Sequence, residues 1–108
     1  MNIMDIDNQI EPPQSFMALY VKPGQTQLNA PQNVVLTRYE QCEDMATVLS
    51  EQAQAIAFNE NLSGKEVLER CYLGLQTSAH FSDKEAEWVI CRLAELLGWE
   101  IPQFLLLP

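Results

Sequence analysis

An apolar seam with helical spacing runs through residues 35–56. Spacings that alternate between four and three residues place side chains on one face of an α-helix. No proline or glycine interrupts residues 32–60, so one helix of roughly 40 Å is predicted over residues 32–59. Val34, Met45 and Val48 lie beside the seam and predict a broad core-facing stripe. The seam consists of Val35, Tyr39, Cys42, Ala46, Leu49, Ala53 and Ile56.

Two further helices begin with a serine followed three residues later by a glutamate. In such a capping box, each side chain binds a backbone N–H that the first helical turn leaves free. Helices are therefore predicted over residues 64–76 and 83–97. Gly98 suits the left-handed residue that follows a helix, and Trp99 can fold back onto the last turn. The two boxes are Ser63–Glu66 and Ser82–Glu85.

Residues 12–21 form the first expected element, after a loose acidic tail over residues 1–11. Pro13 suits the first position of a helix, because its missing N–H costs nothing there. A short helix is favoured, although the apolar residues also alternate as they would in a strand. In either case the element ends at the turn signal of residues 22–24.

Three long helices, one short N-terminal element and short connections predict an all-α fold, a small helical bundle. One domain is expected over residues 12–102, in keeping with a chain of 108 residues. Residues 103–108 then form an apolar tail. Such a tail either offers surface for association or folds over its own bundle. Its large apolar residues are Phe104, Leu105, Leu106 and Leu107.

The chain is acidic, with 15 Asp and Glu against 6 Lys and Arg and a net charge of −9. Lys and Arg supply the phosphate contacts of nucleic-acid binding, and these six are scattered along the chain. We therefore expect binding neither to nucleic acid nor to an anionic membrane. No apolar stretch reaches the length of a bilayer span or a signal peptide. Three cysteines without a CxxC pair indicate reduced thiols in the cytoplasm.

The groups that could perform chemistry do not form a catalytic pattern. Cys42, Cys71 and Cys91 could hold a metal together with His80, but they fall on the core faces of three separate helices. Buried, metal-free thiols are therefore expected. A catalytic triad would need a nucleophile beside His80 and a third group that orients the imidazole. His80 alone does not provide such a set. We predict no catalytic residue, no metal ligand and no cofactor.

Two groups of side chains are candidates for contact with a partner. The acidic flank of the long helix is predicted as a solvated face, with partner binding as the alternative. Trp88 and Arg92 lie four residues apart on the third helix and could form an interface or a cation–π pair. Packing of Trp88 against the N-terminal element is the other interpretation. Trp99 and the apolar tail complete the candidate interaction residues. The acidic flank consists of Glu40, Glu43 and Asp44.

Residues 59–66 partly match the phosphate loop G-x-x-x-x-G-K-[ST]. Asn59 stands where the first glycine is needed, and Glu66 follows Lys65 where a hydroxyl residue is needed. Without the glycine the backbone cannot wrap the phosphates, and without the hydroxyl magnesium loses a ligand. The segment is therefore predicted to be a helix cap, and nucleotide binding is not expected.

Three stretches, residues 15–24, 38–44 and 85–99, resemble a small uncharacterised family of short proteobacterial proteins. Members of that family are often labelled "ATPase with chaperone activity", and the resemblance covers most of residues 12–99. It implies a connection with a chaperone-type ATPase, as an adaptor or a neighbour. It assigns no functional residue.

Two functional hypotheses follow from the sequence. The first is a non-catalytic helical interaction module, an adaptor or regulator that forms a homodimer. The alternative is a small-ligand or metal-binding protein with weak enzymatic activity, which would use the acidic flank or the thiols.

Overall fold

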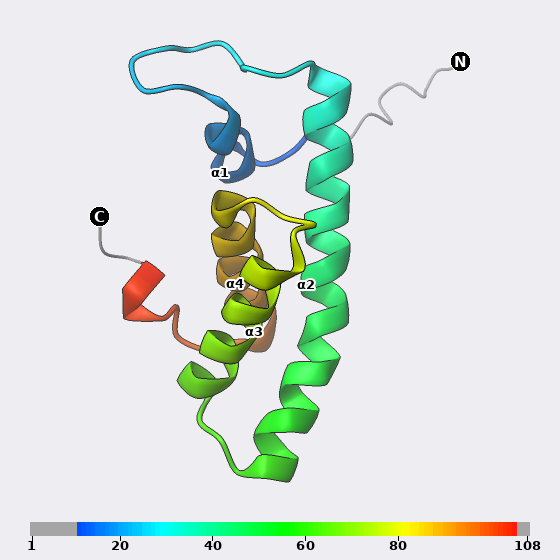
Figure 1. The fold of residues 1–108 in the computed structure, drawn as a ribbon, viewed down its shortest axis with the longest axis vertical. Helices are drawn as coiled ribbons and strands as arrows, with labels where there is room; N and C mark the ends of the chain where they lie inside the picture. The colour runs from blue at the N-terminus through cyan, green and yellow to red at the C-terminus, as the bar shows by residue number, and fades with distance from the viewer. Residues whose placement is uncertain (1–10, 106–108) are drawn as a thin grey trace. The chain divides into compact units, whose positions relative to one another are not determined.

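The computed structural model describes residues 11–105, which are mainly helical (Figure 1). Among these residues, strand-like pairing is limited to one isolated antiparallel bridge, Val21–Leu28. The all-α class is confirmed, and the three long helices end within two residues of the predicted positions. In chain order the elements are α1 (Gln14–Met17), the 3-10 helix η2 (Ala18–Tyr20), α2 (Gln32–Glu60), α3 (Gly64–Ser78), α4 (Asp83–Leu97) and the 3-10 helix η3 (Gln103–Leu105).

The chain divides into two compact units between residues 40 and 41. Helix α2 runs through both units, with residues 32–40 in the first and residues 41–60 in the second. The expectation of a single domain stays a prediction, since the units share this helix. Of the predicted acidic tail, only Glu11 belongs to the described residues, and it is exposed.

Phe16 is the centre of the first unit. Its side chain is fully buried, and its ring centroid lies 5.7 Å from that of Tyr20 and 5.6 Å from that of Tyr39 on α2. The carbonyl of Pro13 accepts hydrogen bonds from the N–H groups of Phe16 and Met17, which begins the helical turn. The N-terminal element is thus helical, as favoured from the sequence, and Pro13 is its N-cap.

Both predicted capping boxes are formed. The N–H of Glu66 donates to the Ser63 hydroxyl at 3.2 Å, and the N–H of Ser63 donates to the Glu66 carboxylate at 3.1 Å. Ser82 and Glu85 make the equivalent pair at 2.9 and 3.1 Å. Hydrogen bonds from the Ser63 backbone and hydroxyl favour the ionised carboxylate, so they lower the pKa of Glu66.

Each of the three long helices is followed by a residue in the left-handed conformation. After α2, the N–H of Leu62 donates to the carbonyl of Ala57 at 3.1 Å. After α4, the N–H of Trp99 donates to the carbonyl of Ala94 at 2.9 Å. These closures satisfy carbonyls that the last turn leaves free. Gly98 was predicted for this position, whereas the other two residues carry a Cβ. The left-handed residues are Asn61 (φ +54°), Ala79 (φ +65°) and Gly98 (φ +70°).

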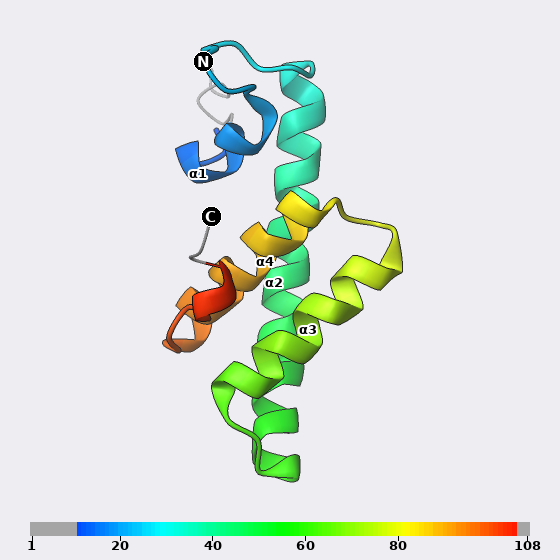
Figure 2. The same cartoon turned by 60° about the vertical axis from the view of Figure 1, so that its left-hand side comes forward.

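The core of the second unit combines small side chains of α2 with larger ones of α3 and α4. Helices α3 and α4 pack side by side and run in roughly opposite directions (Figures 1 and 2). The predicted seam of α2 is confirmed as the buried face, although Tyr39, Leu49 and Ile56 are only half-buried. The buried residues are Cys42, Ala46 and Ala53 of α2, Val67, Leu68 and Leu75 of α3, and Ala86, Val89, Ile90, Leu93 and Ala94 of α4.

The buried stripe of α2 is narrower than predicted. Val34 is 41% exposed and Val48 is 50% exposed, so the prediction that they widen the core face is wrong. Val48 lies two residues from Ala46, which is a rotation of roughly 200° around a helix. Its side chain therefore points away from the core. Met45 is half-buried and does extend the stripe.

Replacing Ala79 with glycine is expected to raise the free energy of unfolding by about 0.5–1 kcal/mol. A left-handed residue with a Cβ is strained, and glycine relieves this strain at a small cost in chain entropy. The same change at Ala55, an exposed residue in the interior of the α2 sequence, is expected to lower the free energy of unfolding by about 0.5–1 kcal/mol. Urea unfolding followed by circular dichroism measures both. A loss of stability in both variants would contradict the left-handed ending at Ala79.

Candidate functional site

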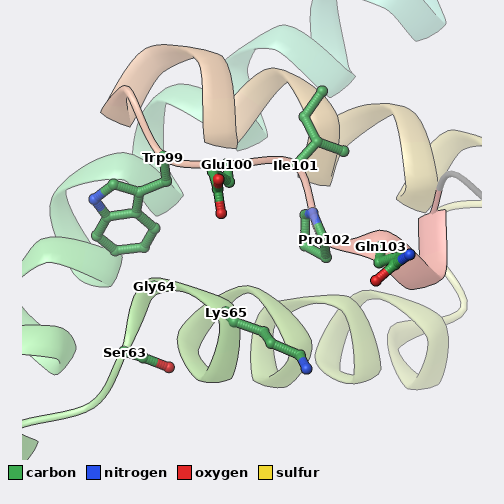
Figure 3. Close-up of a pocket in the computed structure, with 8 residues that line it drawn as sticks. All are labelled: Ser63, Gly64, Lys65, Trp99, Glu100, Ile101, Pro102 and Gln103. Atoms are coloured by element: carbon green, nitrogen blue, oxygen red, sulfur yellow. The ribbon is translucent and has the colours of Figure 1, made fainter.

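An open groove of about 830 Å³ lies in the second unit, between the start of α3 and the segment that follows α4 (Figure 3). The capping box holds one wall, and the chain reversal at Gly98 directs the following residues along the other. We call this space the Trp99 groove. Its lining residues are Ser63, Gly64, Lys65, Trp99, Glu100, Ile101, Pro102 and Gln103.

Trp99 lies directly against Gly64 at one end of the groove (Figure 3). A Cβ added at Gly64 would lie 2.9 Å from Cδ2 and 3.0 Å from Cε3 of the Trp99 indole. Only glycine allows the ring to approach the first turn of α3 this closely. The backbone of Trp99 folds back onto α4, as predicted, while its side chain reaches α3. This contact joins the end of one helix to the start of another.

The charged groups of the Trp99 groove are Lys65 and Glu100, and both residues are exposed. Figure 3 shows the Lys65 side chain along α3 and the Glu100 side chain directed into the space. The hydroxyl of Ser63 is hydrogen-bonded to Glu66, so it acts as a helix cap rather than as a nucleophile. The groove thus offers an aromatic wall and two opposite charges, which suits binding better than covalent chemistry. The predicted helix cap at residues 63–66 is confirmed.

A smaller cleft of about 280 Å³ lies between α3 and η3. The rings of Tyr72 and Phe104 are 5.3 Å apart, and Leu73 beside them is 60% exposed. The hydroxyl of Tyr72 donates to Glu87 at 3.4 Å. Burial of the Tyr72 ring, with the negative charge of Glu87, raises the pKa of the phenol. We call this surface the Leu73 cleft. It is lined by Glu69, Tyr72, Leu73 and Phe104.

The described part of the predicted apolar tail lies against its own α3. Phe104 contacts Tyr72 and is still 36% exposed. Leu105 is half-buried, and its N–H donates to the carbonyl of Pro102 at 3.0 Å. Leu106 and Leu107 lie outside the described residues.

Two predicted interaction residues, Glu43 and Arg92, bind each other. Arg92 Nε donates to Glu43 Oε1 at 2.9 Å, and Nη2 donates to Oε2 at 3.0 Å, which is the strong two-pronged geometry. Arg92 Nη1 also donates to Glu95 at 3.3 Å. Hydrogen bonding to Glu43 is the main cause that raises the pKa of Arg92.

The expected solvated acidic flank is therefore only partly correct. Glu40 and Asp44 are exposed, as predicted. Glu43 is half-buried, because it turns toward α4 and neutralises Arg92. Trp88, the other member of the predicted Trp88–Arg92 pair, is half-buried on α4.

The three cysteines are free thiols. Cys42 is fully buried, as predicted, whereas Cys71 and Cys91 are half-buried. Burial raises the pKa of both half-buried thiols, and the charges of nearby glutamates add to this at Cys91. A raised pKa lowers the fraction of thiolate, which is the nucleophilic form. Within residues 11–105, no three side chains of the metal-binding types His, Cys, Asp and Glu are grouped so that they could hold an ion.

Comparison with known proteins gives no match to a family model, to a curated protein or to a solved structure. The helices found in residues 11–105 lack the combination of length and apolar character needed to cross a lipid bilayer.

Sequence reasoning missed Leu73 and Gly64. Leu73 lies off the face of α3 that carries the buried Val67, Leu68 and Leu75, and a large apolar residue in such a position is a usable signal of surface contact. The importance of Gly64 depends on Trp99, which is distant in the sequence, so no local pattern could indicate it.

Replacing Gly64 with alanine is expected to lower the free energy of unfolding by about 1–3 kcal/mol, because the added Cβ displaces the Trp99 indole. Gly74 is the matched control. It lies in the same helix with no atom within 4 Å of an added Cβ, so Gly74→Ala should be stabilising by about 0.5–1 kcal/mol. Chemical unfolding separates the two. Equal stabilisation by both changes would show that Trp99 does not lie on Gly64.

Cys71 and Cys91 are expected to react with iodoacetamide at pH 7 more slowly than free cysteine, and Cys42 only on unfolding. The pKa values of Cys71 and Cys91 are raised, so their thiolates form only at a pH above the ordinary thiol value of about 8.5. By the same linkage, their contribution to folding is present below that pH and is lost as the pH rises. Mass spectrometry of labelled protein gives the rates. Fast labelling of the native protein at pH 7 would contradict this account.

Proposed function

We propose that the protein is a non-catalytic interaction module, an adaptor or regulator that acts by binding other protein chains. The observation that carries this proposal is the Leu73 cleft. A leucine that is mostly exposed stands there beside two aromatic rings in one continuous apolar surface. Apolar surface of this kind, with a polar residue at its edge, is typical of protein interfaces.

The proposed occupant of the Leu73 cleft is a second copy of the chain. Two-fold homodimers are the commonest oligomers, and in them the same patch of both copies meets. Leu73 of one copy would then pack against Tyr72 and Phe104 of the other. The sequence adds further apolar residues directly after this point, Leu105 to Leu107. They would enlarge the area buried on association.

The hydrogen bonds and pKa values of the potentially reactive groups support a non-catalytic function. Glu43 is bound to Arg92, and the Ser63 hydroxyl is bound to Glu66. The raised pKa values of Cys71 and Cys91 reduce their nucleophilicity. Glu43 and Ser63 therefore have structural functions that compete with catalysis, and the two thiols form little thiolate at neutral pH.

Binding of a small ligand in the Trp99 groove is the second candidate function. The groove has the volume of a typical ligand site, and Trp99 gives it an aromatic wall. Native mass spectrometry separates the two candidates. A bare even-numbered oligomer supports the interaction module, and a retained small molecule supports ligand binding.

The proposal includes a cytoplasmic location, where three free thiols would stay reduced. A chaperone-type ATPase is one partner to test, because the family that the chain resembles carries that label. A pull-down from the source cells, compared between the native protein and a variant of the Leu73 cleft, would test this partner.

Leu73→Gln is expected to weaken self-association at least about tenfold, because two copies of the leucine leave the interface and each is worth about 1.5–3 kcal/mol when buried. Leu96→Gln is the matched control: Leu96 is also exposed, but it does not line the cleft. Sedimentation over a range of concentrations gives the dissociation constants.

Deletion of residues 103–108 should also weaken association while the helical content is kept. A native protein that is monomeric at high micromolar concentration would refute self-association. If the deletion then also lowers the melting temperature sharply, the tail belongs to the core of the monomer.

A further inference from the structure

A row of exposed side chains follows the outer face of α2 in the second unit. The spacings between its members are 4, 3, 4 and 3 residues, so they share one helix face. This face points away from the buried seam of Cys42, Ala46 and Ala53. In Figure 1, α3 and α4 both lie to the left of this part of α2. We call it the outer face. It consists of Asp44, Val48, Glu51, Ala55 and Phe58, and all of them are exposed.

The outer face is more apolar than a solvated helix surface needs to be. Phe58 is 86% exposed, which is the highest value among the large apolar residues of the described chain, and Val48 is half exposed. Together with Ala55 they make an apolar row roughly 15 Å long, or about three helical turns. That length matches the contact made by one amphipathic helix in a helix-in-groove or coiled-coil complex.

Carboxylates interrupt this apolar row. Residues 41–60 contain four acidic residues and no lysine or arginine. Two of the four already have arginine partners in the same unit, Glu43 with Arg92 and Glu60 with Arg70 at 2.9 Å. The other two stand on the outer face: Asp44 lies one turn before Val48, and Glu51 lies between Val48 and Ala55.

This charge pattern indicates what kind of chain can bind to the outer face. A second copy would bring the same carboxylates to the contact and no cation, since a two-fold interface pairs identical surfaces. The chain's own first eleven residues carry Asp5, Asp7 and Glu11 and no Lys or Arg, so they have the same charge sign. A partner with cations beside an apolar row would satisfy both features.

We propose that the outer face of α2 binds an amphipathic helix of a partner protein, in which lysine or arginine residues flank an apolar row. Val48 and Phe58 pack into that row, and Asp44 and Glu51 pair with the flanking cations. The inference rests on the proposed function only in treating the protein as an interaction module. It uses a surface separate from the Leu73 cleft.

The test uses two synthetic helices of three heptads that share the same leucine row. One carries lysine at the flanking positions and the other carries glutamate. Fluorescence anisotropy with the labelled peptides at physiological salt should show that the full chain binds the lysine helix at least about tenfold more tightly than the glutamate helix. Equal affinity for the two helices would overturn the proposal.

Variants separate a defined surface from general attraction to an acidic protein. Phe58→Ser and Glu51→Lys should each weaken binding of the lysine helix about tenfold, and Glu51→Lys should improve binding of the glutamate helix. The control Glu11→Lys makes the same charge change at an exposed residue outside α2, and it should change affinity less than about twofold. An equal effect of Glu51→Lys and Glu11→Lys would refute the site, because net charge alone would then explain binding. No effect of Phe58→Ser would refute it as well.

The same variants keep this inference distinct from self-association. Leu73→Gln should leave binding of the lysine helix unchanged, whether or not it alters the oligomeric state. Peptide binding by a protein that sediments as a monomer would support this inference and contradict the homodimer. If Phe58→Ser dissociates a dimer, the outer face is a contact between copies and the proposal fails. Phe58 is almost fully exposed, so circular dichroism should show unchanged helix in its variant.

Discussion

Burial of the small residues along α2 is the constraint on which the second unit depends. Cys42, Ala46 and Ala53 are fully buried, yet each contributes little apolar area by itself. The larger fully buried side chains of this unit come from α3 and α4, and Leu68 and Ile90 are among the largest of them. Small side chains on one helix allow the axes of its neighbours to come closer. The helices therefore depend on one another, because no single helix carries a complete core.

Two contacts around this core, one polar and one apolar, join the helices. The two-pronged ion pair between Glu43 and Arg92 joins α2 to α4 beside the buried seam. The Trp99 indole on Gly64 joins the end of α4 to the start of α3. The ion pair uses two residues that were predicted to contact a partner, whereas Trp99 packs on Gly64 and also lines the Trp99 groove.

The parts of the fold that were predictable are those that depend on local sequence. A stretch of only four residues marks each of two helix starts, Ser63–Glu66 and Ser82–Glu85. Gly98 marks a helix end just as locally. Contacts between distant segments were not predictable: Arg92 had no sequence signal that named Glu43 as its partner. The error at Val48 has the same origin, because a helical pattern shows which residues share a face but does not set the width of the face that neighbours cover.

Two features of α2, its narrow buried seam and the charge on the opposite side of the helix, make the outer face different from the Leu73 cleft. Because the core covers only one stripe of α2, Val48 and Phe58 remain in solvent, with Glu51 between them and Asp44 one turn before Val48. Like charges in that row oppose contact with an identical copy. The Leu73 cleft has one carboxylate in its lining, that of Glu69, so apolar contact between copies meets less repulsion there. The two surfaces therefore favour different occupants, and a chain that self-associates through one can still hold a basic partner on the other.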